Sequence, residues 1–501
     1  MKNIVSLVAT SVLTMSIANH ANAEDKRYII TFKQGKGETV KSQMRARGGR
    51  KALDIRRQNA MAAHLPEKAL QALRKNPNIE FIEEDVKRYP MSQQVPFGIP
   101  MVQADQLGDT QAGNRTVCII DSGYDIAHED LSGNAVTGSS DPSGAGNWYE
   151  DQSGHGTHVA GTIAAMNNDT GVVGVMPSSN INLHIVKVFG GDGWAYSSSL
   201  MAAAEVCADN GANVINMSLG GERFNFFERR TFNSLNSRGI LSVAAAGNDG
   251  NTQHSYPASY DSVVSVGALD SNKEIWASSQ QTNQVELSAP GVQVLSSVPT
   301  GTGRASSLNV AGVEIEAAPI SGSPLGDITG ALENCDTGES ACNSASGKIC
   351  LIERGNISFA DKVLNCEAGG GIAAVIYNNE AGLLSSATLG ETVTNIPSIG
   401  ISDSDGNALL GQLGASASLA NQASDYEYFN GTSMATPHVA GVAALVWSHF
   451  PSCSNTEIRT ALTATAEDLG DSGRDNAYGY GLVQAKAAYD YLATNGCTGA
   501  I

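Results

Sequence analysis

The hydrophobic positions of the chain fall into short apolar runs that alternate with amphipathic stretches. Five runs are rich in β-branched and small apolar residues, as is typical of buried strands, and they lie at 117–122, 181–189, 212–219, 240–247 and 262–269. Helical periodicity separates them at 198–211 and 226–239 and returns after Ser433. This alternation predicts an α/β fold, a parallel sheet with helices on both faces. Active residues of such sheets gather at the carboxyl ends of the strands.

The first 23 residues have the pattern of a secretory signal peptide. Lys2 precedes an apolar stretch, and the segment ends at Ala21-Asn22-Ala23, a cleavage site of small residues. The apolar run is too short to span a membrane and no comparable run follows. We therefore expect a soluble protein that is exported to the extracellular space, without a membrane anchor.

Residues 24–91 differ in charge from the rest of the chain. They carry 16 lysines and arginines against 9 acids, whereas 92–501 carries 14 against 41. The pattern of 24–91 predicts a small α/β unit, with strands at 28–33, near Ala60 and at 79–85 and a helix within 64–76. Opposite charges favour docking of the two parts. The acidic charge of the larger part argues against binding of nucleic acid or of an anionic membrane.

The segment Gly431–Gly441, GTSMATPHVAG, places a serine at the start of a helix. Ser433 is our candidate nucleophile, because backbone N–H groups at a helix start can stabilise the negative charge that forms on an attacked carbonyl oxygen. A serine at this position can also be a simple N-cap. A nucleophilic role requires a base and an orienting carboxylate elsewhere in the chain.

Two upstream segments supply such residues. Asp121 ends an apolar run in VCIIDSGYD, and His155 opens a helix in HGTHVAGTIAA. Taken alone, Asp121 could cap a turn, and His155 and His158 share a helix face as zinc ligands do, although no Glu or Cys completes a zinc site. The order Asp, His, Ser is one of the known orders of a catalytic triad.

These three segments, with AAAGNDG at 244–250, resemble the subtilisin family of serine endopeptidases. The resemblance implies a subtilisin-like catalytic domain at 92–300 and 424–501, in which Asp121, His155 and Ser433 form the triad and Asn248 donates to the oxyanion. It also implies that two segments hold the substrate peptide, namely Ser218, Leu219 and Gly220, and Ala245, Ala246 and Gly247. From the tripeptide Asn-Asp-Gly alone, Asn248 would be a turn residue.

The same resemblance extends to residues 24–91, which are similar to the inhibitor and chaperone propeptides of subtilisins. It implies an autoprocessed precursor that is inhibited by its own propeptide until cleavage after Met91 leaves a mature chain starting near Ser92.

Calcium is a further implication of the resemblance. The positions that match a calcium site of the family supply oxygen ligands, which suit Ca²⁺: Gln93, Asp130, Met166, Asn168, Thr170 and Val172. The alternative is an ordinary polar turn at 167–171 and a surface acid at Asp130.

Residues 301–423 interrupt the catalytic domain, and 347–379 resembles a protease-associated (PA) domain with the order strand, helix, strand. The insertion either recruits substrate or covers the cleft, or it is a passive decoration. Eight cysteines in an exported chain imply disulfides. We expect Cys335–Cys342 and Cys350–Cys366 within the insertion and Cys453–Cys497 near the C-terminus. Cys118 and Cys207 form either a fourth disulfide or two buried thiols.

Together these features predict a secreted, monomeric serine endopeptidase that cleaves broad protein substrates through an acyl-enzyme. Small residues line the expected pocket for the side chain before the scissile bond, so we expect a preference for large apolar or aromatic residues there. Two alternatives are an inactive scaffold that binds a partner through the insertion, and a processing protease with narrow specificity. The intact set of Asp121, His155, Ser433 and Asn248 argues against the scaffold.

Overall fold

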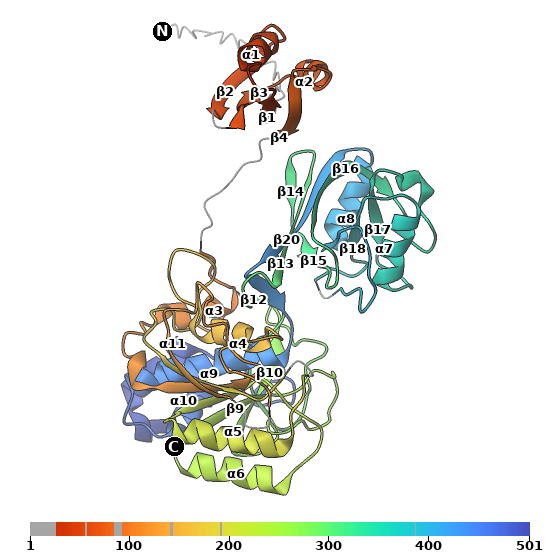
Figure 1. Cartoon of the computed structure of the whole chain (residues 1–501). Coiled ribbons are helices and arrows are strands. Elements are labelled where there is room, and N and C mark those ends of the chain that lie inside the picture. Colours follow the sequence, from red (N-terminus) through yellow and green to blue (C-terminus); the bar gives the residue numbers. More distant parts are fainter. Residues whose placement is uncertain are drawn as a thin grey trace, which may run out of the picture. The chain divides into compact units, whose positions relative to one another are not determined.

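The computed structural model of the chain describes residues 27–55, 58–84, 93–140, 144–190, 193–385 and 387–500 (Figure 1). The predicted signal peptide at 1–23 and the predicted maturation point between Met91 and Ser92 lie outside these residues. The chain divides into two compact units, Met1–Pro90 and Met91–Ile501. Among the described residues, no helix combines the length and the apolar character that a membrane crossing requires.

The N-terminal unit is a four-stranded antiparallel sheet with two helices. Its elements are β1 (Arg27–Phe32), α1 (Gly37–Arg45), β2 (Arg50–Ile55), β3 (Ala60–His64), α2 (Glu67–Arg74) and β4 (Ile79–Glu84), and the strand order is β2-β3-β1-β4. Its core is formed by side chains such as Ile30, Val40, Met61 and Leu73. The structure adds α1 and β2 to the three strands and one helix that the pattern predicts.

The larger unit is built on a seven-stranded sheet in which every pairing is parallel. The order is β11-β10-β9-β8-β5-β7-β6. The strands are β5 (Thr116–Asp121), β6 (Ala135–Ser140), β7 (Asn182–Lys187), β8 (Val214–Met217), β9 (Leu241–Ala245), β10 (Val263–Leu269) and β11 (Val285–Pro290). The five predicted runs are β5, β7, β8, β9 and β10, and the α/β fold with a parallel sheet is confirmed.

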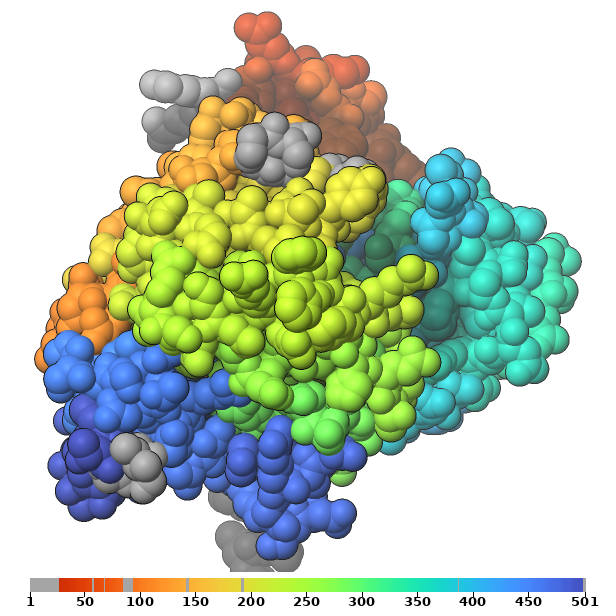
Figure 2. Space-filling model, turned by 90° about the horizontal axis from the view of Figure 1, so that it is seen from below, coloured from red at the N-terminus to blue at the C-terminus, as the bar shows by residue number. Residues whose placement is uncertain are grey.

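Helices cover both faces of this sheet because successive side chains of a strand point to opposite sides. In β5, Val117 and Ile119 pack with α4 (His155–Ala164) and α9 (Thr432–His449), while Cys118 and Ile120 pack with α5 (Ser197–Asp209) and α6 (Phe226–Ser237). Figure 2 shows α5 and α6, in yellow to green, on the surface of this side of the unit. Outside the insertion, the structure also describes the helices α3 (Gly98–Met101), α10 (Asn455–Ala464) and α11 (Ala485–Asn495).

The insertion leaves and re-enters the core through a two-stranded antiparallel ribbon. β12 (Val294–Ser297) pairs with β21 (Tyr426–Phe429), so the two ends of the insertion lie side by side. The insertion itself is an eight-stranded sheet of order β14-β13-β20-β16-β17-β18-β19-β15. Its elements are β13 (Gly303–Val310), β14 (Val313–Ile315), β15 (Ala318–Pro319), β16 (Gly326–Asn334), β17 (Ile349–Glu353), α7 (Phe359–Ala368), β18 (Ala373–Tyr377), β19 (Ser398–Ile401), α8 (Asp403–Leu409) and β20 (Ser416–Ser424).

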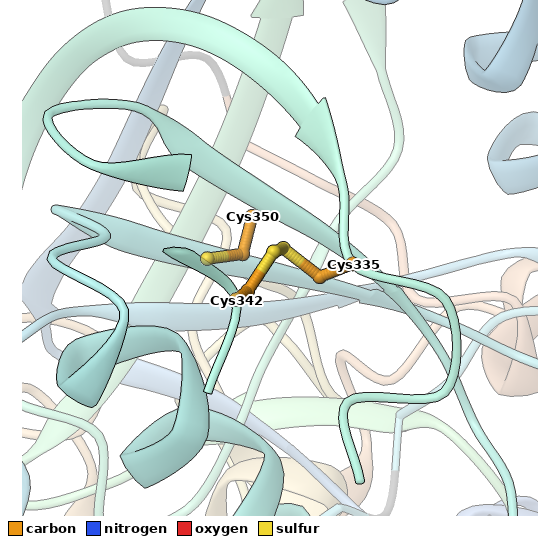
Figure 3. A group of neighbouring side chains, drawn as sticks. All are labelled: Cys335, Cys342 and Cys350. Carbon is orange, nitrogen blue, oxygen red and sulfur yellow. A yellow bond between two sulfur atoms is a disulfide. The ribbon is translucent and has the colours of Figure 1, made fainter. Parts of the chain in front are cut away.

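All eight cysteines form disulfides. The structure joins Cys335 to Cys342, Cys350 to Cys366 and Cys453 to Cys497, and it also joins Cys118 to Cys207, the pair for which the sequence left two states open. The sulfur atoms of Cys335, Cys342 and Cys350 lie within 4.8 Å of one another (Figure 3). These sulfurs belong to two neighbouring disulfides, and because a metal ligand must be a thiolate, the group is no metal site.

Candidate active site

The fold brings Asp121 and His155 together at the carboxyl end of the sheet. Asp121 is the last residue of β5 and is fully buried, and His155 is the first residue of α4. His155 Nδ1 lies 2.8 Å from Asp121 Oδ1, and the Ser122 N–H donates to the same oxygen at 2.7 Å. The His155 side chain remains 29% exposed. The carboxylate therefore fixes the ring, and the other ring nitrogen is free to exchange a proton with a neighbour.

The environment of His155 favours its protonated form. Burial opposes the charge, but the charge of Asp121 and its hydrogen bond, with a further contribution from the charge of Asp151, raise the pKa of His155 above its ordinary value. His158, one turn further along α4, behaves in the opposite way. Its Nε2 lies 3.0 Å from the Val294 carbonyl oxygen, and burial, with the charge of His155, lowers its pKa to about 3. Thus His158 is a neutral core residue.

The loop before α4 is held by the carboxylate of Asp151. Its Oδ1 accepts from the Ser122 hydroxyl and from the N–H groups of Ser153 and Gly154, at 2.9, 3.1 and 2.9 Å. Its Oδ2 accepts from the N–H and the hydroxyl of Thr157, at 2.8 and 2.7 Å. One carboxylate thereby binds the N–H groups of two residues before α4 and that of Thr157 in its first turn, while the Gly156 N–H donates to the Ser122 hydroxyl. Asp151 fixes the start of the helix on which His155 stands.

A fully buried lysine braces the same loop from the sheet. The Lys187 ammonium, at the end of β7, donates to the carbonyl oxygens of Ser122 and Glu150 and to the side-chain oxygen of Gln152, at 2.6, 2.7 and 2.8 Å. Burial lowers the pKa of Lys187. These contacts tie the segment after Asp121 to the segment before His155.

Ser433 is the second residue of α9, and its hydroxyl donates to the Ser218 carbonyl oxygen at 3.1 Å. The Ser218 hydroxyl in turn donates to the Ser433 carbonyl oxygen at 2.7 Å. Rotation about the Cα–Cβ bond of Ser433 would release the hydroxyl from the Ser218 carbonyl oxygen and turn it to another acceptor. In structures without substrate, the hydrogen bonds of catalytic groups are often not yet aligned.

Asn248 is oriented by the residue before Ser433. Its side-chain oxygen accepts from both the N–H and the hydroxyl of Thr432, at 2.9 and 2.8 Å, so its NH₂ group points the other way. A Cβ atom built on Gly431 would lie 3.5 Å from the Ser433 backbone nitrogen and 3.6 Å from Asn248 Nδ2. The Ser433 backbone nitrogen and Asn248 Nδ2 therefore lie near one common point beside the serine, as two donors to one oxyanion must.

A cavity of about 620 Å³ contains Asp121 and His155 and continues along one of the expected substrate segments, Ser218–Gly220. The other segment is buried at Ala245 and Ala246 and ends at Gly247, which has a φ of +112°. A Cβ atom at Gly247 would lie 2.4 Å from the side-chain oxygen of Gln280. Glycine is thus the residue that this backbone tolerates.

The expected calcium ligands also lie together. Gln93 Nε2 donates to the carbonyl oxygens of Met166 and Val172, at 2.6 and 3.1 Å, and lies 3.4 Å from the side-chain oxygen of Asn168. Asp130 is fully buried and accepts from the Val172 N–H and from the Asn168 side chain. Asn168 accepts from Thr170. The Oε1 and Nε2 atoms of a glutamine amide are distinguished only by their contacts. If the Gln93 amide is rotated by half a turn, its Oε1 joins the oxygen atoms of the other expected ligands. The residues fit a calcium ion.

The sequence profile described as "Subtilase family" matches residues 113–315 and 368–481. The chain belongs to the subtilase family. It is a subtilisin-type serine endopeptidase. A second profile, described as "PA domain", matches residues 324–409, within the insertion.

Known relatives of this subtilase span most of its length. Subtilisin amylosacchariticus from Bacillus subtilis subsp. amylosacchariticus is 30% identical over 495 residues, 96% of each chain. M-protease from Shouchella clausii (strain KSM-K16) is 32% identical over 85% of this chain and 78% of its own. A crystal structure is known for a psychrophilic subtilisin-like protease from the Antarctic psychrotroph Pseudoalteromonas sp. AS-11. Its sequence is 46% identical to this chain, and the two structures superpose with a TM-score of 0.68 over 81% of this chain and 100% of the other.

Sequence reasoning missed three residues around the site of this subtilase. Asp151 lies four positions before His155, where an acid ahead of a helix start is a capping signal. Thr432 is adjacent to Ser433, but no feature of the sequence indicates that it donates to Asn248. Lys187 is the single charge in an apolar strand run, and a buried lysine of this kind indicates a specific set of acceptors.

Proposed function

We propose that Ser433, His155 and Asp121 are the catalytic triad of this endopeptidase and that Asn248 and the Ser433 N–H bind the oxyanion. In the first step, His155 takes the proton of the Ser433 hydroxyl as its oxygen attacks the scissile carbonyl carbon. His155 then gives the proton to the leaving amine. Water, activated by the same imidazole, hydrolyses the acyl-enzyme and regenerates Ser433.

The observation that carries this proposal is the contact between His155 and the buried Asp121 carboxylate in the cleft cavity. His155 contacts this carboxylate through Nδ1, and the Ser433 backbone nitrogen and Asn248 Nδ2 lie near one common point beside Gly431. The Ser433 hydroxyl, which donates to the Ser218 carbonyl oxygen, would turn toward His155 for the attack. Asp121 orients the ring and stabilises the imidazolium that forms during attack.

Substrate peptides would lie along Ser218, Leu219 and Gly220, with the side chain before the scissile bond in the pocket next to Ala245, Ala246 and Gly247. Those three residues are small, and two of them are apolar and buried. We therefore propose broad cleavage of proteins after large apolar or aromatic residues. A higher kcat/KM for arginine than for phenylalanine or leucine at that position would contradict this preference.

Calcium binding at Gln93, Asp130, Met166, Asn168, Thr170 and Val172 has a structural role in this proposal. The ion would neutralise the buried Asp130 carboxylate and join the start of the larger unit to the loop at 166–172. No step of the reaction depends on it.

The chain is further proposed to be the precursor of a secreted, monomeric enzyme, with a signal peptide at 1–23, an inhibitory propeptide at 24–91, a catalytic domain at 92–300 and 424–501 and an inserted domain at 301–423. The basic charge of 24–91 and the acidic charge of the remainder support this organisation. The propeptide would occupy the cleft until its own enzyme removes it.

One experiment tests the site and the maturation together. The precursor is expressed as wild type and as Ser433→Ala, and the mass and N-terminus of each are followed with time. We expect the wild type to convert to a chain that starts near Ser92, while the variant keeps its propeptide. If both convert alike, another protease makes the cut and autoprocessing is wrong. If the active enzyme begins at Glu24, residues 24–91 are not a propeptide.

A further inference from the structure

The cleft cavity contains a buried acid that the proposed mechanism does not use. Glu228, in the first turn of α6, lines the same cavity as Asp121 and His155, and it is only 4% exposed. Segment Ser218–Gly221 lines the cavity too. A peptide that extends from His155 along this segment therefore enters the part of the cavity that contains Glu228.

The hydrogen-bond partners of the Glu228 side chain are two uncharged hydroxyl groups. Ser197 donates its hydroxyl to Oε1 at 2.6 Å, and Tyr260 donates its hydroxyl to Oε2 at 2.7 Å. Burial, together with this carboxylate, raises the pKa of Tyr260, so the phenol remains a donor. The first turns of α5 and α6 meet at this point, and helix N-termini favour negative charge.

Among the residues that the structure describes, Glu228 forms no ion pair with a lysine or an arginine. Within the described ranges, no lysine or arginine nitrogen lies within 4.0 Å of Glu228. The guanidinium of the next residue, Arg229, lies over the rings of Phe224 and Phe226, at 5.1 and 5.5 Å from their centroids. Arg223 lines the cavity but is exposed to solvent. Each carboxylate oxygen accepts one hydroxyl in these contacts and has a further lone pair for another donor.

The walls of this part of the cavity are aromatic. Phe189, Trp194, Tyr196 and Tyr256 line it, and Trp194 and Tyr196 are 54% and 68% exposed, with their rings in edge contact. Exposed aromatic rings beside a cleft are typical of a binding surface. Ring faces attract ammonium and guanidinium groups, and an acid at the inner end of an aromatic pocket adds a charged hydrogen-bond acceptor.

We propose that the end of the cleft around Glu228 binds a lysine or arginine side chain of the substrate, at a position removed from the scissile bond. This second specificity pocket rests on the proposed cleavage at Ser433, but it makes a separate claim. The aromatic rings hold the stem of the basic side chain, and Glu228 accepts from its charged end. The enzyme then combines an apolar preference next to the scissile bond with a basic preference further along the peptide.

The test is a series of fluorogenic peptides that share phenylalanine before the scissile bond. Each peptide carries arginine, or the neutral analogue citrulline, at one of the second, third or fourth positions before that bond. For the wild type we expect kcat/KM to be about 10-fold higher or more with arginine than with citrulline at one position, mainly through KM, because a charged hydrogen bond in a desolvated site is worth that much.

The matched variants are Glu228→Gln and Glu205→Gln. Glu228→Gln keeps the size of the side chain, and we expect the ratio of arginine to citrulline to fall toward one. Glu205 is on α5 and pairs with Arg238 at the surface, so Glu205→Gln should keep the wild-type ratio. If Glu228→Gln does not fold, Trp194→Leu removes one of the aromatic rings that line the cavity. The ratio of arginine to citrulline should then fall in Trp194→Leu as well.

Two results overturn the proposal. One is a wild-type ratio near one at all three positions, and the other is a Glu228→Gln enzyme that melts at a lower temperature but keeps the wild-type ratio. In the second case Glu228 serves only to join α5 and α6. Failure of the proposed cleavage is a different result, namely that no peptide of the series is cut by the wild type.

Discussion

The substitution Asp151→Asn separates a charge effect from a structural effect at the start of α4. The carboxylate accepts five hydrogen bonds, three at Oδ1 and two at Oδ2. An asparagine has one acceptor oxygen, so its NH₂ group must face either the two donors of Thr157 or the three on the other side. The hydroxyl on either side can rotate to accept from the NH₂ group, so one backbone N–H (Thr157) or two (Ser153 and Gly154) lose their acceptor. At this half-buried position the loss should cost about 2 kcal/mol of stability, a fall of several degrees in melting temperature.

The same substitution removes a negative charge that favours the protonated form of His155. The pKa of His155 is raised by Asp121 first and by Asp151 in addition, so the loss of Asp151 lowers it. His155 accepts the proton of Ser433 only when it is neutral, and kcat/KM therefore falls as the pH drops through this pKa. In Asp151→Asn, the acidic limb of the pH profile should move to lower pH.

The assay is kcat/KM against pH with an uncharged fluorogenic peptide. Glu150→Gln is the control, because Glu150 is the neighbouring acid, is exposed, and contributes its backbone carbonyl to Lys187. We expect its acidic limb at the wild-type position. A limb that stays in place in Asp151→Asn, or moves to higher pH, would refute the electrostatic part of the reasoning even if the melting temperature falls.

Three further predictions concern the oxyanion donor, the calcium ligands and the core disulfide. Asn248→Ala should lower kcat by about 100- to 1000-fold with little change in KM, which is the effect known for the loss of this donor in subtilisin. A rise in KM of the same size with kcat unchanged would instead indicate a role in substrate binding. Addition of EDTA should lower the melting temperature of the wild type but not of Asp130→Ala, whereas equal responses of the two would exclude calcium at this site. Replacing Cys118 and Cys207 together by alanine opens a loop with a sequence separation of 89. The chain-entropy relation for the unfolded state then gives a loss of about 4–5 kcal/mol in the free energy of unfolding. Scanning calorimetry at a fixed rate measures this loss, and an unchanged melting temperature would contradict it.

The sheet and the triad segments could be predicted from the sequence because their signals are local. Apolar β-branched runs such as β10 are buried along their whole length, and this is visible as composition. The segments around Asp121, His155 and Ser433 resemble known motifs over several residues. In the N-terminal unit, β2 was not predicted because its side chains are mostly exposed and its sequence has no apolar alternation.

The supporting contacts could not be predicted because they join residues that are distant in the sequence. Lys187 donates to carbonyl oxygens 65 and 37 positions away, and Glu228 accepts from Tyr260 across 32 positions. For Cys118 and Cys207, the strand and the helix were expected, but their separation in space depends on how α5 crosses the sheet. Such contacts depend on packing that no local pattern encodes.

The proposed function depends above all on Ser433 as the nucleophile of this subtilase. The direct measurement is to treat the active enzyme with a phosphonyl fluoride, which reacts with an activated serine, and to locate the adduct by mass spectrometry of its peptides. We expect one adduct per chain, on Ser433, with activity lost in proportion to labelling, and no adduct in His155→Ala. An adduct on another residue, or full activity after Ser433 is labelled, would contradict it.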